Sequence, residues 1–240
     1  MEPIQSYENT FVVQQEECDI FNKMMPAAFL RWAQQASIDH CNHVGLTEEV
    51  YKQTHTAFLM AKVAIEFFAP VYAGQQLTLT TIPFSPKRAM YHRICKFCDQ
   101  HGSLVALYDS RWILVNTDTR RILRQPPQEM NFPFLLPIEK ELDFSFEKPP
   151  FEKVSHSCAS YSLCDCNGHI NHTRYADLFC DCLDPELIKK HRISKMVLVY
   201  HHEIPFGNPF DISYGYKDNQ LYVAAQSHEK ACTEGAIWLQ

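Results

Sequence analysis

Two stretches with the same apolar spacing decide the fold of this chain: residues 26–36 read PAAFLRWAQQA, and residues 175–182 read YADLFCDC. The first opens with proline, which favours the first turn of a helix, and apolar residues follow at i, i+3, i+4 and i+7. The second has the same spacing, each residue lying 146 positions after its counterpart. The four pairs are Phe29 and Tyr175, Trp32 and Leu178, Ala33 and Phe179, and Ala36 and Cys182. Each stretch is therefore predicted to form a long helix with one buried face.

The segments that follow the two helices also correspond, at a separation of 133 residues. Residues 61–63 match 194–196, and the alternating Leu77 and Leu79 match Phe210 and Ile212. Such alternation is typical of a strand with one buried face. Later runs at 88–98, 104–116, 220–226 and 231–240 are predicted to complete a long antiparallel sheet in each half. The change of separation from 146 to 133 gives the first copy 13 extra residues between its helix and its strands.

The distribution of proline divides the chain. Six of its 14 prolines fall between residues 125 and 150, a composition that resists helix and central strand. We therefore expect a first unit at 1–124, a connector at 125–150 and a second unit at 151–240. One helix on a curled antiparallel sheet is an α+β arrangement, and two copies are expected to join their sheets edge to edge as a pseudo-dimer.

Composition excludes several classes of protein. The chain has only seven glycines and no G-x-G, so phosphate-binding loops and dinucleotide fingerprints are absent. A net charge of −6 argues against a nucleic-acid partner. No signal peptide is visible in residues 1–17, and no apolar run approaches the roughly 20 residues of a membrane span. The ten cysteines are expected to be reduced, and the protein cytoplasmic with no membrane partner.

The segment before the second helix carries the candidate chemistry. Residues 163–175 read LCDCNGHINHTRY, which places Asp165, Asn167 and His169 at alternate positions. If this segment is extended, all three side chains point toward the helix N-terminus, where free N–H groups favour a developing oxyanion. A carboxylate, an amide and an imidazole in that position predict a site for acyl-transfer hydrolysis.

This motif, in a tandem repeat of this length, resembles that of the acyl-acyl-carrier-protein thioesterases, which are double hotdog proteins. The resemblance implies hydrolysis of acyl-acyl-carrier-protein thioesters to free fatty acids in fatty acid biosynthesis, with acyl carrier protein as partner. It also implies a catalytic acid on the following strand, and Glu203 lies 34 residues after His169. Plant members often have cysteine directly after this acid, whereas this chain has Ile204, which argues against a cysteine nucleophile there. No transit-like N-terminal extension is visible, so a bacterial-type member is expected. No cofactor is expected, because a thioester is already activated.

The repeat indicates that the chemistry belongs to the second copy alone. Asn167 corresponds to Phe21, His169 to Lys23 and Glu203 to Pro70, and only Asp165 keeps its identity, as Asp19. We expect Glu203, alone or with Asp165 through water, to act as the general base. His169 and Asn167 would position the water and polarise the thioester carbonyl, while helix N–H groups complete the oxyanion site.

Several alternatives stay open at this point. Asp165 is as well explained as a turn or cap residue, because Asp19 shares its place. An acyl-CoA thioesterase and a non-catalytic acyl-binding sensor fit the same pattern, and a homodimer is a further alternative. The adjacent His201 and His202 face opposite ways on a strand, so no metal site is expected.

An acidic carrier protein needs a basic docking surface on this acidic chain. The basic clusters are Lys87 and Arg88, then Arg120, Arg121 and Arg124, and then Lys189, Lys190 and Arg192. The last cluster lies in sequence between the second helix and the Glu203 strand. The sequence therefore favours docking near Lys189, Lys190 and Arg192.

Overall fold

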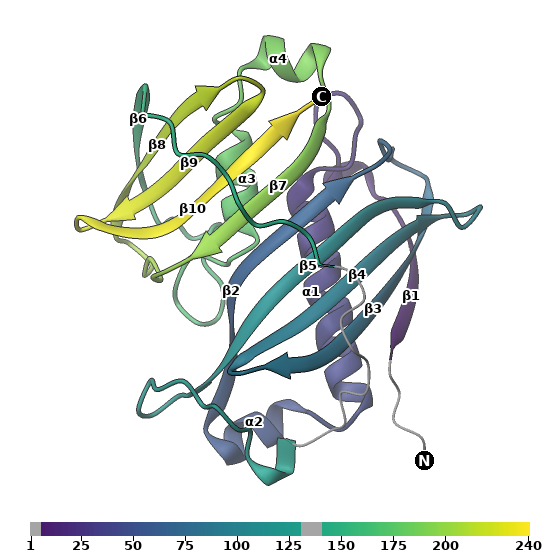
Figure 1. The fold of residues 1–240 in the computed structure, drawn as a ribbon, viewed down its shortest axis with the longest axis vertical. Coiled ribbons are helices and arrows are strands. Elements are labelled where there is room, and N and C mark those ends of the chain that lie inside the picture. The colour runs from purple at the N-terminus through teal and green to yellow at the C-terminus, as the bar shows by residue number, and fades with distance from the viewer. Residues whose placement is uncertain (1–5, 131–140) are drawn as a thin grey trace.

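The computed structural model describes residues 6–130 and 141–240, and within them ten strands form one antiparallel sheet with helices on one face (Figure 1). None of the helices in these ranges is long and apolar enough to cross a membrane. The elements of the first half are β1 (Tyr7–Val12), a 3-10 turn (Gln15–Glu17), α1 (Pro26–His43), α2 (Glu48–Thr54), β2 (Thr56–Phe67), β3 (Gln76–Lys87), β4 (Met90–Asp99), β5 (Leu104–Asn116) and a second 3-10 turn (Gln128–Met130). Those of the second half are β6 (Lys153–Cys158), α3 (Arg174–Cys180), α4 (Pro185–Lys190), β7 (Ile193–Tyr200), β8 (Pro209–Lys217), β9 (Gln220–Ser227) and β10 (Lys230–Leu239).

The sheet has an internal twofold arrangement. Its strand order is β1-β3-β4-β5-β2-β7-β10-β9-β8-β6, so each half repeats the other from the opposite edge. The halves meet where β2 pairs with β7, and there Ala64 lies opposite Val197, its own counterpart at the separation of 133. The expected edge-to-edge junction is confirmed. It covers a strand edge that each half would otherwise expose.

The two helices differ more than the repeat predicts. α1 has 18 residues, whereas α3 has seven, so the expectation of a long second helix was wrong. The chain leaves α3 through tight turns in which the N–H of Leu183 donates to the carbonyl of Cys180. Asp184 then caps α4 by accepting the N–H of Glu186, and Pro185 cannot continue a helix that arrives from α3. The extra residues of the first half lie in the longer α1 and in α2.

The helices cover the inner face of the sheet and bury the core there. Phe29 of α1 packs edge-on against Phe67 and Phe97, with ring centroids 5.2 and 5.1 Å apart. Phe179 of α3 is fully buried on the same face. Small residues, Ala28, Ala33 and Ala36, line the buried side of α1, and they let this helix approach the sheet closely.

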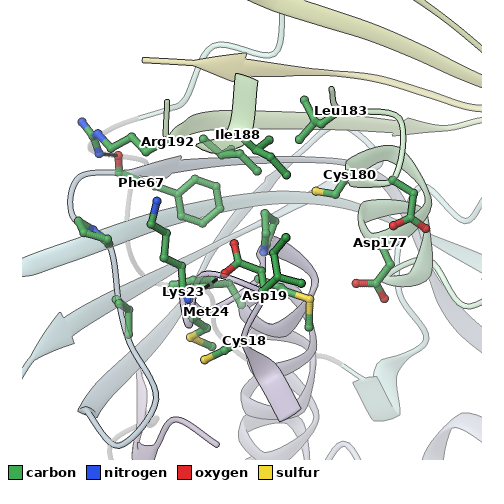
Figure 2. A pocket seen from close by; sticks show the side chains of 18 of the residues that line it. Cys18, Asp19, Lys23, Met24, Phe67, Asp177, Cys180, Leu183, Ile188 and Arg192 are labelled. Atoms are coloured by element: carbon green, nitrogen blue, oxygen red, sulfur yellow. Dashed lines mark hydrogen bonds between the residues drawn. The ribbon is translucent and has the colours of Figure 1, made fainter. Parts of the chain in front are cut away.

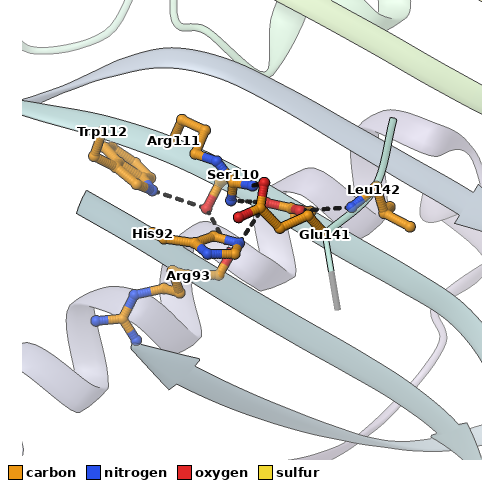
Figure 3. Close-up of polar contacts among 8 residues, drawn as sticks. His92, Arg93, Ser110, Arg111, Trp112, Glu141 and Leu142 are labelled. Atoms are coloured by element: carbon orange, nitrogen blue, oxygen red, sulfur yellow. Dashed lines mark hydrogen bonds and ion pairs between the residues drawn. The ribbon is translucent and has the colours of Figure 1, made fainter. Parts of the chain in front are cut away.

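The outer face is crossed by the end of the connector. Residues 141–150 form neither helix nor strand and run over the sheet between its halves (Figure 1), while 131–140 lie outside the described residues. The Asp109 carboxylate accepts the backbone N–H of Leu142 at 2.9 Å and forms an ion pair with Arg111, and His92 Nε2 lies 2.8 Å from it (Figure 3). Arg111 also reaches Glu141 at 3.3 Å. A buried carboxylate thus anchors the connector to β5.

Candidate active site

The loop that carries the predicted motif is a tight turn. The N–H of Asp165 donates to the carbonyl of His169 at 3.1 Å, and the N–H of Gly168 donates back to Asp165 at 3.0 Å. The Asp165 carboxylate accepts the N–H of Asn167 at 2.8 Å, and Gly168 has a φ of +78°, which glycine adopts without strain. The expectation of an extended segment was therefore wrong. Asn167 lies exposed in this turn, and α3 begins only at Arg174.

His169 and Glu203 are brought together by a bridge between their segments. His169 pairs with Pro205, and the N–H of Ile170 donates to the carbonyl of Ile204 at 3.0 Å. His169 Nε2 then lies 3.5 Å from Glu203 Oε1, with the imidazole 24% and the carboxylate 52% exposed. The His169 Nδ1–H donates to the carbonyl of Ile170 at 3.1 Å, so Nε2 is the nitrogen that faces the acid. A water molecule can contact both atoms at this separation.

Asn171 joins the turn to the start of α3. Its Nδ2 donates to Asp165 Oδ2 at 2.9 Å, and its Oδ1 accepts the backbone N–H and the hydroxyl of Thr173 at 2.9 and 2.7 Å. Both carboxylate oxygens of Asp165 are therefore engaged in holding the loop. This arrangement fixes the turn, and with it His169, relative to the helix.

The first half contains the same turn without the reactive groups. The N–H of Asp19 donates to the carbonyl of Lys23 at 2.8 Å, and Asp19 Oδ1 accepts the N–H groups of Phe21 and Lys23, each at 2.9 Å. Asn22, with a φ of +62°, stands in the place of Gly168. The shared aspartate thus has the same turn-forming contacts in both halves, as its preserved identity indicated.

Comparing the repeats further would have revealed two polar residues that sequence reasoning missed. Asn171 corresponds to Met25 and Thr173 to Ala27, so this hydrogen-bonded pair exists only in the second half. Their neighbour His172 lies edge-on to Trp112 and Tyr200, with ring centroids 5.9 Å away in each case. Burial lowers the pKa of His172 to about 4, so the ring is neutral near pH 7.

A cleft of about 330 Å³ opens beside the turn. One wall is the exposed side of α1, with Arg31, Gln34, Gln35 and Ile38, and the other includes Asp165, Asn171 and Arg174. Asn167, His169 and Glu203 do not line this cleft. Of the four predicted residues, the structure therefore pairs His169 with Glu203, places Asp165 at the cleft and leaves Asn167 exposed on the turn.

The basic cluster expected near the site lies at the other end of a strand. Lys189 and Lys190 end α4, before β7 begins, whereas Glu203 follows the end of β7 (Figure 1). Eight residues of strand, at roughly 3.3 Å each, put about 25 Å between these positions. Arg192 donates to the carbonyl of Phe67 and to Gln240, each at 2.9 Å. Contrary to expectation, Lys189, Lys190 and Arg192 are therefore not close to Glu203, because a full strand separates them, while docking of a carrier protein on these residues stays a prediction.

Two half-sheets joined edge to edge through β2 and β7, with helices on one face and an imidazole–carboxylate pair in one half, define a double hotdog protein with a candidate hydrolytic site in its second half. The chain belongs to the acyl-ACP thioesterase family: residues 4–131 match the family's N-terminal domain and residues 153–238 its C-terminal domain.

Relatives and solved structures agree with this assignment. The chain is 24% identical to oleoyl-acyl carrier protein thioesterase 2, chloroplastic, of Arabidopsis thaliana, over 82% of this chain and 59% of the length of that relative. An acyl-ACP thioesterase of Bacteroides thetaiotaomicron superposes with a TM-score of 0.85 at 18% identity, covering 98% of both chains. The 12:0-ACP thioesterase of Umbellularia californica superposes with a TM-score of 0.82 at 14% identity, covering 98% of this chain and 97% of its own.

Proposed function

We propose that this protein hydrolyses acyl-acyl-carrier-protein thioesters to a free fatty acid and the carrier thiol. The observation that carries the proposal is the pair of His169 Nε2 and Glu203 Oε1, 3.5 Å apart, in the half of a thioesterase-family chain that alone retains both groups. An imidazole and a carboxylate at this separation can hold and deprotonate one water molecule.

In the proposed mechanism that water donates one hydrogen bond to each group. Glu203 accepts a proton as the oxygen bonds to the thioester carbon, and the carbonyl oxygen becomes an oxyanion. Asn167, exposed on the turn, donates its side-chain N–H to that oxygen. The carbon–sulfur bond then breaks, and the proton on Glu203 passes to the leaving thiolate. No cofactor takes part in any of these steps.

Asp165 and Asn171 act as positioning residues in this mechanism. The carboxylate of Asp165 holds the turn, and the Asn171 amide connects the turn to the start of α3. Neither side chain is within hydrogen-bond distance of His169 or Glu203 among the described contacts. Their role is to keep His169 at its place opposite Glu203.

We also propose that the carrier protein docks on Arg120, Arg121 and Arg124. Thr56 of β2 pairs with Asn116 at the end of β5, while β7 ends beside Lys62 of β2. The segment after β5 and the Glu203 segment after β7 therefore leave the same end of the sheet. All three arginines are exposed, as docking to an acidic partner requires.

The ten cysteines fit a reducing compartment. All of them are free in the structure, including the exposed Cys158 and Cys166. Free thiols persist where glutathione and thioredoxin keep them reduced. We therefore propose the cytoplasm as the place of the reaction.

A thiol-release assay with DTNB tests the proposed function directly. The substrates are acyl carrier proteins that bear saturated, unsaturated and branched acyl chains of several lengths, each compared with its CoA thioester. Release from at least one carrier-linked substrate is expected. Release from CoA thioesters alone would assign an acyl-CoA thioesterase, and ligand binding with no release from any substrate would overturn the hydrolytic function.

A further inference from the structure

A second and larger cavity lies on the first-half side of the molecule. Its volume is about 630 Å³, within the range of small-molecule sites. Its floor includes Met24 and Phe29, and its opposite wall comes from the second half, with Leu183 and Ile188 (Figure 2). Both halves of the chain are thus needed to form it.

This cavity is the twofold counterpart of the cleft beside Asp165. Asp19 lines the larger cavity as Asp165 lines the cleft, and the helix residues correspond as well. Asp177 and Cys180 of α3, with Asp181 directly after it, hold the places that Arg31, Gln34 and Gln35 of α1 hold in the cleft, at the separation of 146. The fold therefore forms two related cavities, one beside the turn of Asp165, which precedes His169, and one beside the turn of Asp19, which has Lys23 in place of His169.

The substitutions in this second site change its charge. Lys23 replaces His169, and Pro70 replaces Glu203, so a carboxylate is removed and a permanent cation is introduced. The loss of the carboxylate and the imidazole excludes hydrolysis at this site, and the added cation favours binding of an anion. At the catalytic site, by contrast, Glu203 would repel one.

The other cations of the cavity are already engaged. Arg31 and Arg174 both contact the Asp177 carboxylate, at 3.3 and 3.4 Å, and Arg192 donates to Phe67 and Gln240. Among the described residues, Lys23 forms no ion pair; its amine lies 5.7 Å from the centroid of the Phe21 ring.

In the described part of the chain, four acids line the cavity, and none of them forms an ion pair with Lys23: Glu16, Asp19, Asp177 and Asp181. Asp19 Oδ1 is held by backbone N–H groups of its own turn. Asp181 forms no ion pair with Lys23, and burial and the nearby Asp177 raise its pKa. The positive charge of Lys23 is therefore available to a ligand.

Beside the amine, one part of the wall is apolar. Figure 2 shows the Lys23 side chain rising beside the Phe67 ring, with Ile188 and Leu183 above it and Cys180 farther along. A ligand that fits has one anionic end and a hydrocarbon body. A carboxylate at Lys23 can form a charge-assisted hydrogen bond, while the chain is buried between the two halves.

We propose that this cavity is a non-catalytic binding site for a free fatty acid, with its carboxylate on Lys23 and its chain along Phe67, Leu183 and Ile188. The choice of a fatty acid as the physiological ligand rests on the proposed function, because hydrolysis produces that molecule. The binding itself is independent of hydrolysis.

Calorimetric titration with laurate, and with the uncharged dodecanol as matched ligand, tests the site. Wild-type protein is expected to bind laurate at least tenfold more tightly than dodecanol. Lys23→Met keeps the apolar stem, so it should weaken laurate binding at least tenfold and leave dodecanol unchanged. The control Lys189→Met removes the same charge from exposed α4 and should bind as wild type does. Wild-type affinity for laurate in Lys23→Met would overturn the proposal.

A second measurement needs no variant. Laurate should protect Lys23 of the wild-type protein from acetylation by acetic anhydride, measured by mass spectrometry, while Lys189 stays reactive. Unchanged labelling of Lys23 at saturating laurate would also overturn the site. Thiol release without protection of Lys23 refutes only this inference, and protection without thiol release refutes only the proposed function.

Discussion

Arg31 of α1 forms an ion pair with Asp177 of α3, with 3.3 Å between Nη1 and Oδ2, and the two residues hold the same place in their halves. The internal twofold axis thus passes between side chains of opposite charge, as it passes between Ala64 and Val197 in the sheet. Arg31 lines both the cleft beside Asp165 and the larger cavity. The duplication has therefore been used to form two different sites around one shared contact.

Removing either member of the catalytic pair should abolish turnover without unfolding the protein. His169→Ala and Glu203→Gln are expected to lower kcat by about 10²- to 10⁴-fold, the usual range for an acid–base group. The melting temperature should stay near that of wild type, because Glu203 is 52% exposed and His169 has few side-chain contacts. Thiol release and thermal melts followed by circular dichroism measure the two effects. Glu229→Gln, on the exposed β9–β10 turn, is the matched control.

Asp19→Ala and Asp165→Ala form a matched pair that separates stability from catalysis. Each substitution removes the side-chain contacts of the same turn, so each should lower the free energy of unfolding by about 1–2 kcal/mol. Only Asp165→Ala should also lower kcat, by tenfold or more, because His169 follows that turn. Urea denaturation and thiol release give both values. Equal kcat for the two variants would refute a positioning role for Asp165.

Replacing Asn171 with Met, the residue of the first half, tests the link between the turn and α3. The variant loses the hydrogen bonds to Asp165 and Thr173, and kcat is expected to fall at least tenfold with a smaller change in KM. Met25→Leu is the control in the first half. Wild-type kcat in Asn171→Met would mean that the turn holds His169 without this link.

Charge reversal should locate the docking surface. Arg120→Glu combined with Arg121→Glu should raise KM for carrier-linked substrates several-fold and leave KM for CoA thioesters unchanged, because only the carrier is expected to contact this surface. Lys189→Glu combined with Lys190→Glu carries the same change in charge at the far end of β7 and should affect neither substrate. A larger effect from the lysine pair would reverse this assignment.

Acidification should destabilise the protein through His172. Burial lowers the pKa of His172 to about 4, below the 6.5 of the unfolded chain. As pH falls, the unfolded state thus binds the proton before the folded state does. The stability that the neutral His172 contributes to the fold is therefore complete above pH 6.5 and is lost toward pH 4. The shift corresponds to about 3 kcal/mol. Urea denaturation at pH 7 and pH 4.5 should give a smaller difference for His172→Phe than for wild type; equal differences would contradict the assignment.

Removing the carboxylate beneath the connector should be destabilising. Asp109→Ala removes one of the two acidic partners of the buried Arg111, which keeps Glu141, and leaves the N–H of Leu142 without its acceptor, at a cost of about 1–3 kcal/mol. Urea denaturation measures the loss. Asp143→Ala, on the exposed part of the same connector, should cost much less.

The predicted elements that were correct are those with a buried face. The runs around β4, β5, β9 and β10 alternate in burial or are almost wholly buried, and their strands lie where the sequence places them. β1 and β6 were not predicted. Their bounds nevertheless correspond, because Tyr7–Val12 and Lys153–Cys158 begin and end 146 residues apart. Both are edge strands. β6 is exposed along its whole length, so burial imposes no pattern on its residues, and in β1 the burial alternates but only Phe11 is fully buried.

The residues of the candidate site could be identified from the sequence, but their arrangement in space could not. Comparing the two copies separated Asn167, His169 and Glu203 from the shared Asp165, and the same comparison would have added Asn171. The alternate spacing of the polar residues predicted an extended segment. In the structure the Asp165 side chain and the positive φ of Gly168 close that segment into a tight turn instead.

The sequence by itself determined the duplication, the buried faces of the first helix and of the inner strands, and the confinement of the reactive groups to one half. These properties are local or repeated, so they are visible in the periodic pattern of the sequence. Only the tertiary structure decided that His169 meets Glu203, that Lys189 lies a strand's length from the site, and that Lys23 faces a cavity formed by both halves. The first depends on the bridge between His169 and Pro205, the second on the length of β7, and the third on the pairing of β2 with β7. Long-range contacts of this kind leave no periodic pattern in the chain.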